Sequence, residues 1–150
     1  MLRLECKTFK SLSLEELHNL FALRSEVFVV EQDCVYQDID KKDFNALHIL
    51  GFDEANKLIA YSRILPKGDS YTSHSSIGRV VVHKEFRGKN FGHKLVEFCI
   101  KTIEEYFKET TIKISAQSHL VSFYNTHGFE KTGDEYLEDG IPHVAMLFSK

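Results

Sequence analysis

The sequence predicts an α/β (α+β) fold in which a mixed, mainly antiparallel sheet is flanked by helices. Three strand-like runs follow one another at residues 47–52, 58–65 and 77–83, and a long amphipathic helix follows at about residues 91–108. This order of elements is typical of such a sheet. The chain has 150 residues, which fits one domain, 1–150, and leaves little room for a second.

The N-terminal part predicts a strand at residues 2–8 and then a helix. Ser13 and Glu16 have the spacing of a capping box, which marks a helix start. The apolar face of that helix consists of Leu17, Leu20, Phe21, Val27 and Phe28. Residues 31–43 are polar and acidic, so we expect a loop or a broken helix there.

The C-terminal part predicts the remaining elements. The long helix should bury Phe91, Leu95, Phe98, Cys99, Thr102 and Tyr106. We then expect a strand at 111–116, a short helix at 119–127, and closing strands at 129–131 and 143–148 joined by a turn-rich stretch at 138–142. A homodimer through the edge of the closing strands stays open, although nothing in the sequence requires one.

Composition narrows the classes of function. The net charge of −3 argues against general binding to nucleic acid or to an anionic membrane, which needs a basic surplus. No apolar run approaches the roughly 20 residues that span a bilayer, and the N-terminus lacks the pattern of a signal peptide, so we expect a cytoplasmic protein. The three cysteines are widely spaced, which favours buried reduced thiols and no metal site.

A basic loop with two glycines lies between the third strand and the long helix. Residues 84–94 hold four Lys or Arg against one Glu. The loop ends at a helix N-terminus, where backbone N–H groups lack partners and the helix dipole is positive, so it suits a pyrophosphate. Gly88 lets the chain pass close to a ligand, and Gly92 lets the helix pack tightly. The alternative is a glycine-softened helix start with a solvated basic edge.

Two other phosphate-binding patterns fit this loop less well. The spacing from Gly88 to Gly92 is one residue too short for a P-loop, and the closing Gly-Lys-Ser/Thr is missing. No strand–helix–strand dinucleotide unit surrounds it either.

A second stretch, residues 116–129, joins a strand end to a short helix and a further strand. Gly128 suits the position just after the helix C-terminus. We expect Phe123 to face the core and Tyr124 to point elsewhere. A Phe-Tyr pair alone usually packs in the core, but here it stands five residues before Gly128-Phe129.

These two stretches resemble motifs A and B of the GNAT superfamily of N-acetyltransferases. Arg87-Gly-Lys-Asn-Phe-Gly92 after a valine strand looks like motif A, with Asn90 where glycine is usual. Asparagine tolerates the left-handed conformation best after glycine, so the loop shape can survive. Blocks at residues 24–32, 36–40 and 136–143 extend the resemblance to the bacterial ElaA-type branch over nearly the whole chain.

The resemblance implies a GNAT-like fold with two splayed strands that form a cleft for acetyl-CoA, used without a metal. The expected cofactor-binding residues are Val80, Val81, Val82, Arg87, Gly88, Lys89, Asn90, Phe91 and Gly92. Tyr124 is the expected general acid for the departing thiolate, because an ordinary tyrosine stays protonated at neutral pH. The alternative is that Tyr124 only orients the cofactor sulfur.

The acceptor is expected to be a small-molecule or peptide amine. Glu31, Asp38 and His143 are the expected acceptor-binding residues. Residues 31–43 hold five carboxylates, which favour a cationic acceptor, although a solvated loop explains them equally well. Asp38 and Asp40 lack the glycine and the closing glutamate of a calcium loop. The sequence does not choose a general base among Glu26, Glu31, His48, His119 and His143.

Two rival functions stay open. The first is a non-catalytic acyl-CoA-binding module that senses a metabolite or docks a partner, since its cofactor loop would look the same. The second is a thiol enzyme that uses Cys34.

Overall fold

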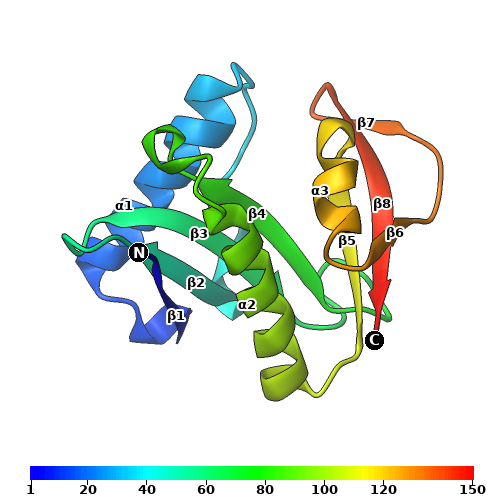
Figure 1. Ribbon diagram of the computed structural model, residues 1–150, viewed down its shortest axis with the longest axis horizontal. Coiled ribbons are helices and arrows are strands. Elements are labelled where there is room, and N and C mark those ends of the chain that lie inside the picture. The colour runs from blue at the N-terminus through cyan, green and yellow to red at the C-terminus, as the bar shows by residue number, and fades with distance from the viewer.

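The computed structural model describes residues 1–150 and contains two antiparallel sheets (Figure 1). The first sheet has the order β1-β2-β3-β4, with strands β1 (Arg3–Thr8), β2 (Leu47–Phe52), β3 (Leu58–Leu65) and β4 (Ser76–Val82). The second has the order β5-β8-β6, with β7 also paired to β8, from β5 (Thr111–Gln117), β6 (Phe129–Lys131), β7 (Tyr136–Glu138) and β8 (Ile141–Ser149). The predicted fold class is confirmed.

Three helices complete the fold: α1 (Leu14–Arg24), α2 (Phe91–Phe107) and α3 (Val121–Asn125). Helix α1 runs on into a wider turn, a π-helix at Ser25–Glu31, and a 3-10 turn at Lys41–Asn45 precedes β2. Figure 1 shows α2 across the front of the first sheet and α3 beside β5. No helix of the chain combines the length and the apolar character that crossing a bilayer requires.

Helices α1 and α2 cover opposite faces of the first sheet. In β2, Ile49 belongs to the core that packs on α2, and its neighbour Leu50 belongs to the core that packs on α1. Ala60 and Tyr61 divide in the same way on β3. Since successive side chains of a strand point to opposite faces, all six residues of β2 are buried.

The predicted start of α1 is confirmed, and the predicted face of α2 needs a correction. Ser13 Oγ accepts from Glu16 N–H at 3.0 Å, and Glu16 Oε1 accepts from Ser13 N–H at 2.8 Å. On α2, Ile103 is buried, whereas Tyr106 is 61% exposed. Tyr106 was expected on the buried face. A buried tyrosine needs a hydrogen-bond partner for its hydroxyl, whereas Ile103 needs none, so Ile103 takes the buried position.

Strand β4 contains a bulge. Tyr61 pairs with Val81 and Arg63 with Gly78, so two residues of β4 lie opposite one residue of β3. Arg79, inside the bulge, has a φ of 50°, in the left-handed region. Bulges bend a strand and increase its twist, so β4 is turned away from its next neighbour.

The two sheets meet at one point, beside the start of β4. Ser75 and Ile112 form a single parallel bridge, and Lys113 N–H donates to the Ser75 carbonyl at 3.0 Å. From this bridge β4 and β5 diverge toward the top of Figure 1. The edge of β4 that faces β5 is therefore left without a strand partner, as the predicted splaying requires.

A buried arginine at the end of α1 holds the segment before β2. Arg24 has no exposed surface; its Nε donates to Asp38 at 2.9 Å and its Nη1 to Asp43 at 2.7 Å. Burial acts to lower the pKa of Arg24, but hydrogen bonds and the charges of both aspartates outweigh it and raise that pKa. Likewise, burial acts to raise the pKa of Asp43, and Arg24 and Arg63 together hold it below its ordinary value.

We predict that Arg24→Met strongly destabilises the fold. The change removes the fully buried cation that pairs with both Asp38 and Asp43, and breaking a buried ion pair from one side typically costs about 3–5 kcal/mol. Urea unfolding followed by circular dichroism measures the loss. Lys67→Met is the matched control, because the Lys67–Glu109 pair lies at the surface, and removing it should cost less than about 1 kcal/mol. Equal stability of both variants would contradict the prediction.

Candidate active site

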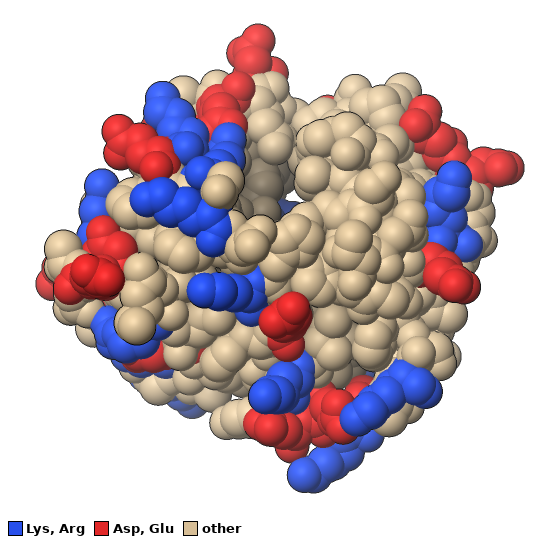
Figure 2. Space-filling view, viewed as in Figure 1, with Lys and Arg blue, Asp and Glu red and all other residues tan.

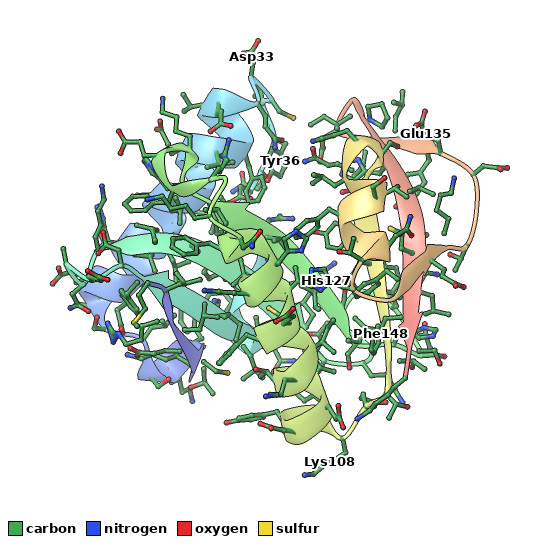
Figure 3. All side chains as sticks on the ribbon, in the orientation of Figure 1. Asp33, Tyr36, Lys108, His127, Glu135 and Phe148 are labelled. Atoms are coloured by element: carbon green, nitrogen blue, oxygen red, sulfur yellow. The ribbon has the colours of Figure 1, made fainter.

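The gap between the diverging strands opens into a pocket of about 530 Å³. Its walls come from β4 (Ser76–Val80), from β5, from Tyr124 on α3 and from the β7–β8 hairpin, and residues of the 32–42 segment close one side. Figure 2 shows the molecule hollowed between its left and right parts at this place. In Figure 3 Tyr36 stands on the left wall, and His127 lies between α2 and α3.

A larger hollow of about 940 Å³ lies elsewhere, beside α1 and β1. Glu15, Glu16, Lys7 and Arg3 line it, and none of the predicted cofactor residues does. The smaller pocket therefore carries the candidate chemistry, because it is the one that contains the unpaired edge of β4.

The predicted pyrophosphate loop leads from β4 into the first turn of α2. Gly88 has a φ of 82° and open space where a side chain would point. Asn90 adopts the left-handed conformation, with a φ of 64°, and its side chain does not cap the helix. The N–H groups of the first turn, which begins at Phe91, are thus left without an intrahelical or side-chain partner. A side chain on Gly92 would touch the ring of Phe123 at 3.5 Å.

The charge of this loop is partly neutralised. Arg87 forms a bidentate ion pair with Glu31 at 2.6 and 3.1 Å, and its Nε donates to the Val82 carbonyl at 2.9 Å. The hydrogen bond from Arg87 lowers the pKa of Glu31, and Lys84 adds to this effect. Lys89 lies over the ring of Phe86 at 5.5 Å. Figure 2 shows basic side chains gathered at the upper left, mixed with acidic ones.

Glu31 was expected to bind the acceptor, and that role stays a prediction. Its carboxylate pairs with Arg87 in the loop between β4 and α2. In this arrangement Glu31 and Arg87 tie the turn after α1 to the loop after β4.

The valines of β4 divide between the two faces of the sheet. Val81 is buried in the core beneath α1, while Val80 and Val82 are half-buried and pack on the core beneath α2. Val80 also lines the pocket. Their side chains fix the position of the strand, which leaves its free backbone edge toward β5 as the part able to bind a ligand.

Tyr124 and Phe123 exchange the places that the sequence suggested. Tyr124 is 7% exposed, belongs to the core and lines the pocket, while Phe123 is only half-buried and packs on the core from outside. The ring of Phe123 lies 4.6 Å from that of His93 on α2, so it fills the space between α3 and α2. Burial raises the pKa of Tyr124, which keeps its hydroxyl protonated at neutral pH.

Four of the five carboxylates in the acidic segment are held by arginines: Glu31 by Arg87, and Asp38, Asp40 and Asp43 by arginines of the core. Asp38 is bound to Arg24 and lies 2.8 Å from the Nε of Arg79. Asp40 accepts from Arg63 at 2.6 Å. Asp38 is also buried, so its carboxylate shapes the pocket wall from behind instead of projecting into the pocket.

The candidate bases are separated by their surroundings. His48 is fully buried, and both ring nitrogens are engaged, Nδ1 with the Tyr61 hydroxyl at 2.7 Å and Nε2 with the Asp43 carbonyl at 2.9 Å. Glu26 lines the other hollow, and His119 is exposed on the turn after β5. Of the five candidates, only His143 lines the pocket between β4 and β5.

His143 lies at the start of β8, in contact with β7. Its Nδ1 is 2.7 Å from the Ile141 carbonyl, and its Nε2 is 3.5 Å from Glu138 Oε2. The ring stacks on Tyr136 with a centroid distance of 6.3 Å. Strand β7 was not predicted from the sequence, and neither was a role for Glu138. The signal was present, since Asp139-Gly140 is a typical two-residue hairpin turn, and both residues have positive φ.

The sequence matches the family described as "Acetyltransferase (GNAT) domain" over residues 10–150. The protein ElaA of Escherichia coli is 42% identical over 137 residues, which cover 90% of this chain and 88% of ElaA. A UPF0039 protein of Synechocystis is 43% identical over 141 residues, covering 93% of this chain and 90% of that protein.

Comparison with solved structures agrees with these sequence matches. The structure of an acyl-CoA N-acyltransferase from Pseudomonas aeruginosa superposes with a TM-score of 0.92 at 38% identity, covering 99% of this chain and 100% of that one. The crystal structure of Escherichia coli ElaA gives a TM-score of 0.91 at 37% identity, with the same coverage of both chains.

The chain belongs to the GNAT family of acetyltransferases and is an acyl-CoA-dependent transferase. Within that family it is of the ElaA type, since its likeness to ElaA in sequence and in structure extends over nearly the whole chain. The resemblance noted from motifs A and B is thereby confirmed.

We predict that Asn90→Val weakens the binding of coenzyme A about tenfold. A β-branched residue in the left-handed conformation costs about 1–2 kcal/mol, which the loop recovers only by leaving the shape that presents its N–H groups. Isothermal titration calorimetry measures the dissociation constant. Lys108→Val is the matched control, because Lys108 has a φ of 58° at the far end of α2. The control should lose stability and keep its affinity, and equal affinities of the two variants would refute the prediction.

Proposed function

We propose that the protein transfers the acetyl group of acetyl-CoA to a primary amine by direct attack, with Tyr124 as the general acid. The observation that carries this proposal is the pocket between β4 and β5, which Val80 and the β7–β8 hairpin both line; β4 continues beyond Val80 and leads into the Arg87–Gly92 loop. A cofactor that reaches from the loop into the pocket would present its thioester beside Tyr124.

The residues present fit coenzyme A. Gly88 leaves open space above the loop, and the first turn of α2 supplies free N–H groups for the pyrophosphate. The free backbone edge of Val80 to Val82 suits the pantetheine arm, whose amides bind like an added strand. Lys89 adds positive charge nearby. No group of three or more metal-ligating side chains converges in the structure, and use of the cofactor without a metal stays a prediction.

In the proposed reaction the amine attacks the thioester carbon, and negative charge develops on the carbonyl oxygen. A free N–H group of β4 would stabilise that oxygen. The thiolate leaves with the electron pair of the carbon–sulfur bond, and the Tyr124 hydroxyl donates a proton to it. The support for this role is the position of Tyr124 in the pocket; burial raises its pKa, which keeps the hydroxyl protonated at neutral pH but also makes it a weaker proton donor.

The acceptor is proposed to be a small-molecule or peptide amine. A preference for cations stays a prediction, and it finds less support than the sequence alone suggested, because arginines offset three of the aspartates. The carboxylates that remain at the pocket wall are those of Glu138 and Asp139. Cytoplasmic localisation and a homodimer likewise stay predictions.

The two rival functions, a non-catalytic acyl-CoA sensor and a thiol enzyme, predict different behaviour. A non-catalytic sensor would bind acetyl-CoA and release no thiol over many turnovers. A thiol enzyme would need Cys34, whose Sγ lies 3.4 Å from the Asp139 carbonyl in a buried position. If the Cys34→Ser variant keeps its activity, the hypothesis of a thiol enzyme is excluded.

The first test is a calorimetric titration with acetyl-CoA. We expect tight binding of acetyl-CoA. Binding should be lost with acetyl-pantetheine, because this compound lacks the nucleotide pyrophosphate that the loop at the start of α2 would bind. A panel of primary amines then tests for multiple-turnover thiol release. The absence of binding at millimolar acetyl-CoA would overturn the proposed function.

We further predict that Tyr124→Phe lowers kcat at least about 100-fold and changes the affinity for acetyl-CoA less than about threefold. General acid catalysis typically contributes a factor of about 10²–10⁴, and phenylalanine keeps the ring that packs in the core. Thiol release and calorimetry measure the two quantities. Full turnover in the variant would mean that Tyr124 does not donate the proton.

A further inference from the structure

We propose that His143 is the general base that removes a proton from the acceptor amine, and that Glu138 positions it. This inference rests on the proposed function and names a further residue of the same reaction. It is carried by the arrangement of His143 between a backbone carbonyl and a carboxylate, in the pocket that contains Tyr124.

The contact of Nδ1 fixes which nitrogen carries the proton. A carbonyl oxygen only accepts, so Nδ1 must donate to the Ile141 carbonyl at 2.7 Å and therefore holds the hydrogen of the neutral ring. Nε2 then carries the lone pair. This is the form that a base needs, and the backbone enforces it without any help from the substrate.

The carboxylate of Glu138 completes the arrangement on the other side. Its Oε2 is 3.5 Å from Nε2, where it stabilises an imidazolium once a proton has arrived. Its Oε1 accepts from Ser115 Oγ at 3.1 Å, and Ser115 in turn bonds the Tyr136 hydroxyl. The ring of Tyr136 stacks on His143, so one cluster holds both the carboxylate and the imidazole.

The fold brings this cluster to the reacting end of the pocket. His143 pairs with Gln117, the last residue of β5, and α3 with Tyr124 follows within a few residues. The base would thus come from the hairpin and the acid from the helix. Two proton-transfer groups on different elements allow an amine to enter between them.

Protons and electrons balance in the resulting step. The nitrogen lone pair forms the new bond to the thioester carbon, and Nε2 of His143 takes a proton from that nitrogen. Collapse breaks the carbon–sulfur bond, sulfur takes the electron pair, and Tyr124 protonates the sulfur. Between turnovers one proton passes through solvent from the imidazolium to the tyrosinate, which restores both groups.

Other titratable or charged groups face the same pocket and bear on any pH dependence. They are Tyr136 and Glu138 from β7, Asp139 from the turn, Tyr124 from α3, Arg79 from β4, Arg63 from β3, Tyr71 from the loop before β4, and Cys34, Tyr36, Asp40 and Lys42 from the segment before β2. Only a pH limb that disappears when His143 is replaced can therefore be assigned to His143.

The test compares His143→Asn with the wild-type protein, using n-propylamine and hydroxylamine as acceptors of acetyl-CoA. Asparagine can keep a donor near the Ile141 carbonyl but offers no base. Both amines attack in their neutral form. The nitrogen of the more basic propylamine then holds its surplus proton firmly and needs the base, whereas the less basic nitrogen of hydroxylamine loses that proton to water more readily. We expect kcat/KM to fall about 100-fold for propylamine and less than about 10-fold for hydroxylamine. The limb at low pH should disappear in the variant.

Two further variants separate catalysis from structure. His18→Asn makes the same chemical change on the exposed side of α1 and should leave both rates unchanged. Glu138→Gln should lower the propylamine rate about 10-fold and keep the low-pH limb, because His143 is still present. Affinity for acetyl-CoA should be the same in all of them.

The outcomes distinguish this inference from the proposed function. Equal losses with both amines, or an unchanged pH limb in His143→Asn, would show that His143 has only a structural role and overturn the inference while the acyltransferase stands. Thiol release by the wild-type protein with neither amine, despite cofactor binding, would overturn both.

Discussion

Strand β4 carries one residue more than its partner β3 can pair, and the surplus lies at Arg79–Val80, opposite Ser62. A non-glycine residue with a φ of 50° costs on the order of 1–3 kcal/mol, so the surrounding structure must hold it in place. Ser62 contributes by donating its hydroxyl to the Gly78 carbonyl at 3.0 Å. What the chain gains is a strand that turns away from β5 and leaves a free backbone edge. The pocket, the cofactor path and the place of Tyr124 all depend on that separation.

The side chain of the strained residue supports the opposite wall. Arg79 lies beside Asp38 and over the ring of Tyr36 at 5.6 Å, and Asp38 is held from behind by the fully buried Arg24. The bulge and the 32–40 segment therefore stabilise each other. Because the charges in this cluster are buried together, they serve to fix a shape, and they contribute little field to the pocket. An acidic segment in the sequence is in this way converted into a neutral, rigid wall.

The sequence predicted local features better than long-range partners. The capping box at Ser13, the bounds of β2 and β3 and the left-handed Asn90 follow from propensities of adjacent residues, so they were within reach. The role of Arg24 could not be predicted from the sequence. An arginine at the end of a helix is ordinarily solvated, and only the fold brings Asp38 and Asp43 to it. Phe123 and Tyr124 were exchanged for a related reason, since a one-residue rotation of a short helix cannot be read without knowing what packs on it.

In the loop between β4 and α2, for which we propose cofactor binding, backbone and side chains would have different tasks. The Nε and both Nη groups of Arg87 donate to Val82 and Glu31. An anion at the loop would have to compete with a bidentate carboxylate for this side chain, so the binding groups that need no exchange of partners are the backbone N–H groups at the start of α2 and the lysines beside them. The Glu31–Arg87 pair holds the loop against the turn after α1, so its proposed effect on the cofactor is indirect. A glutamate next to the proposed pyrophosphate site is unfavourable by charge alone, and we explain it as the partner that would keep the loop in its binding shape.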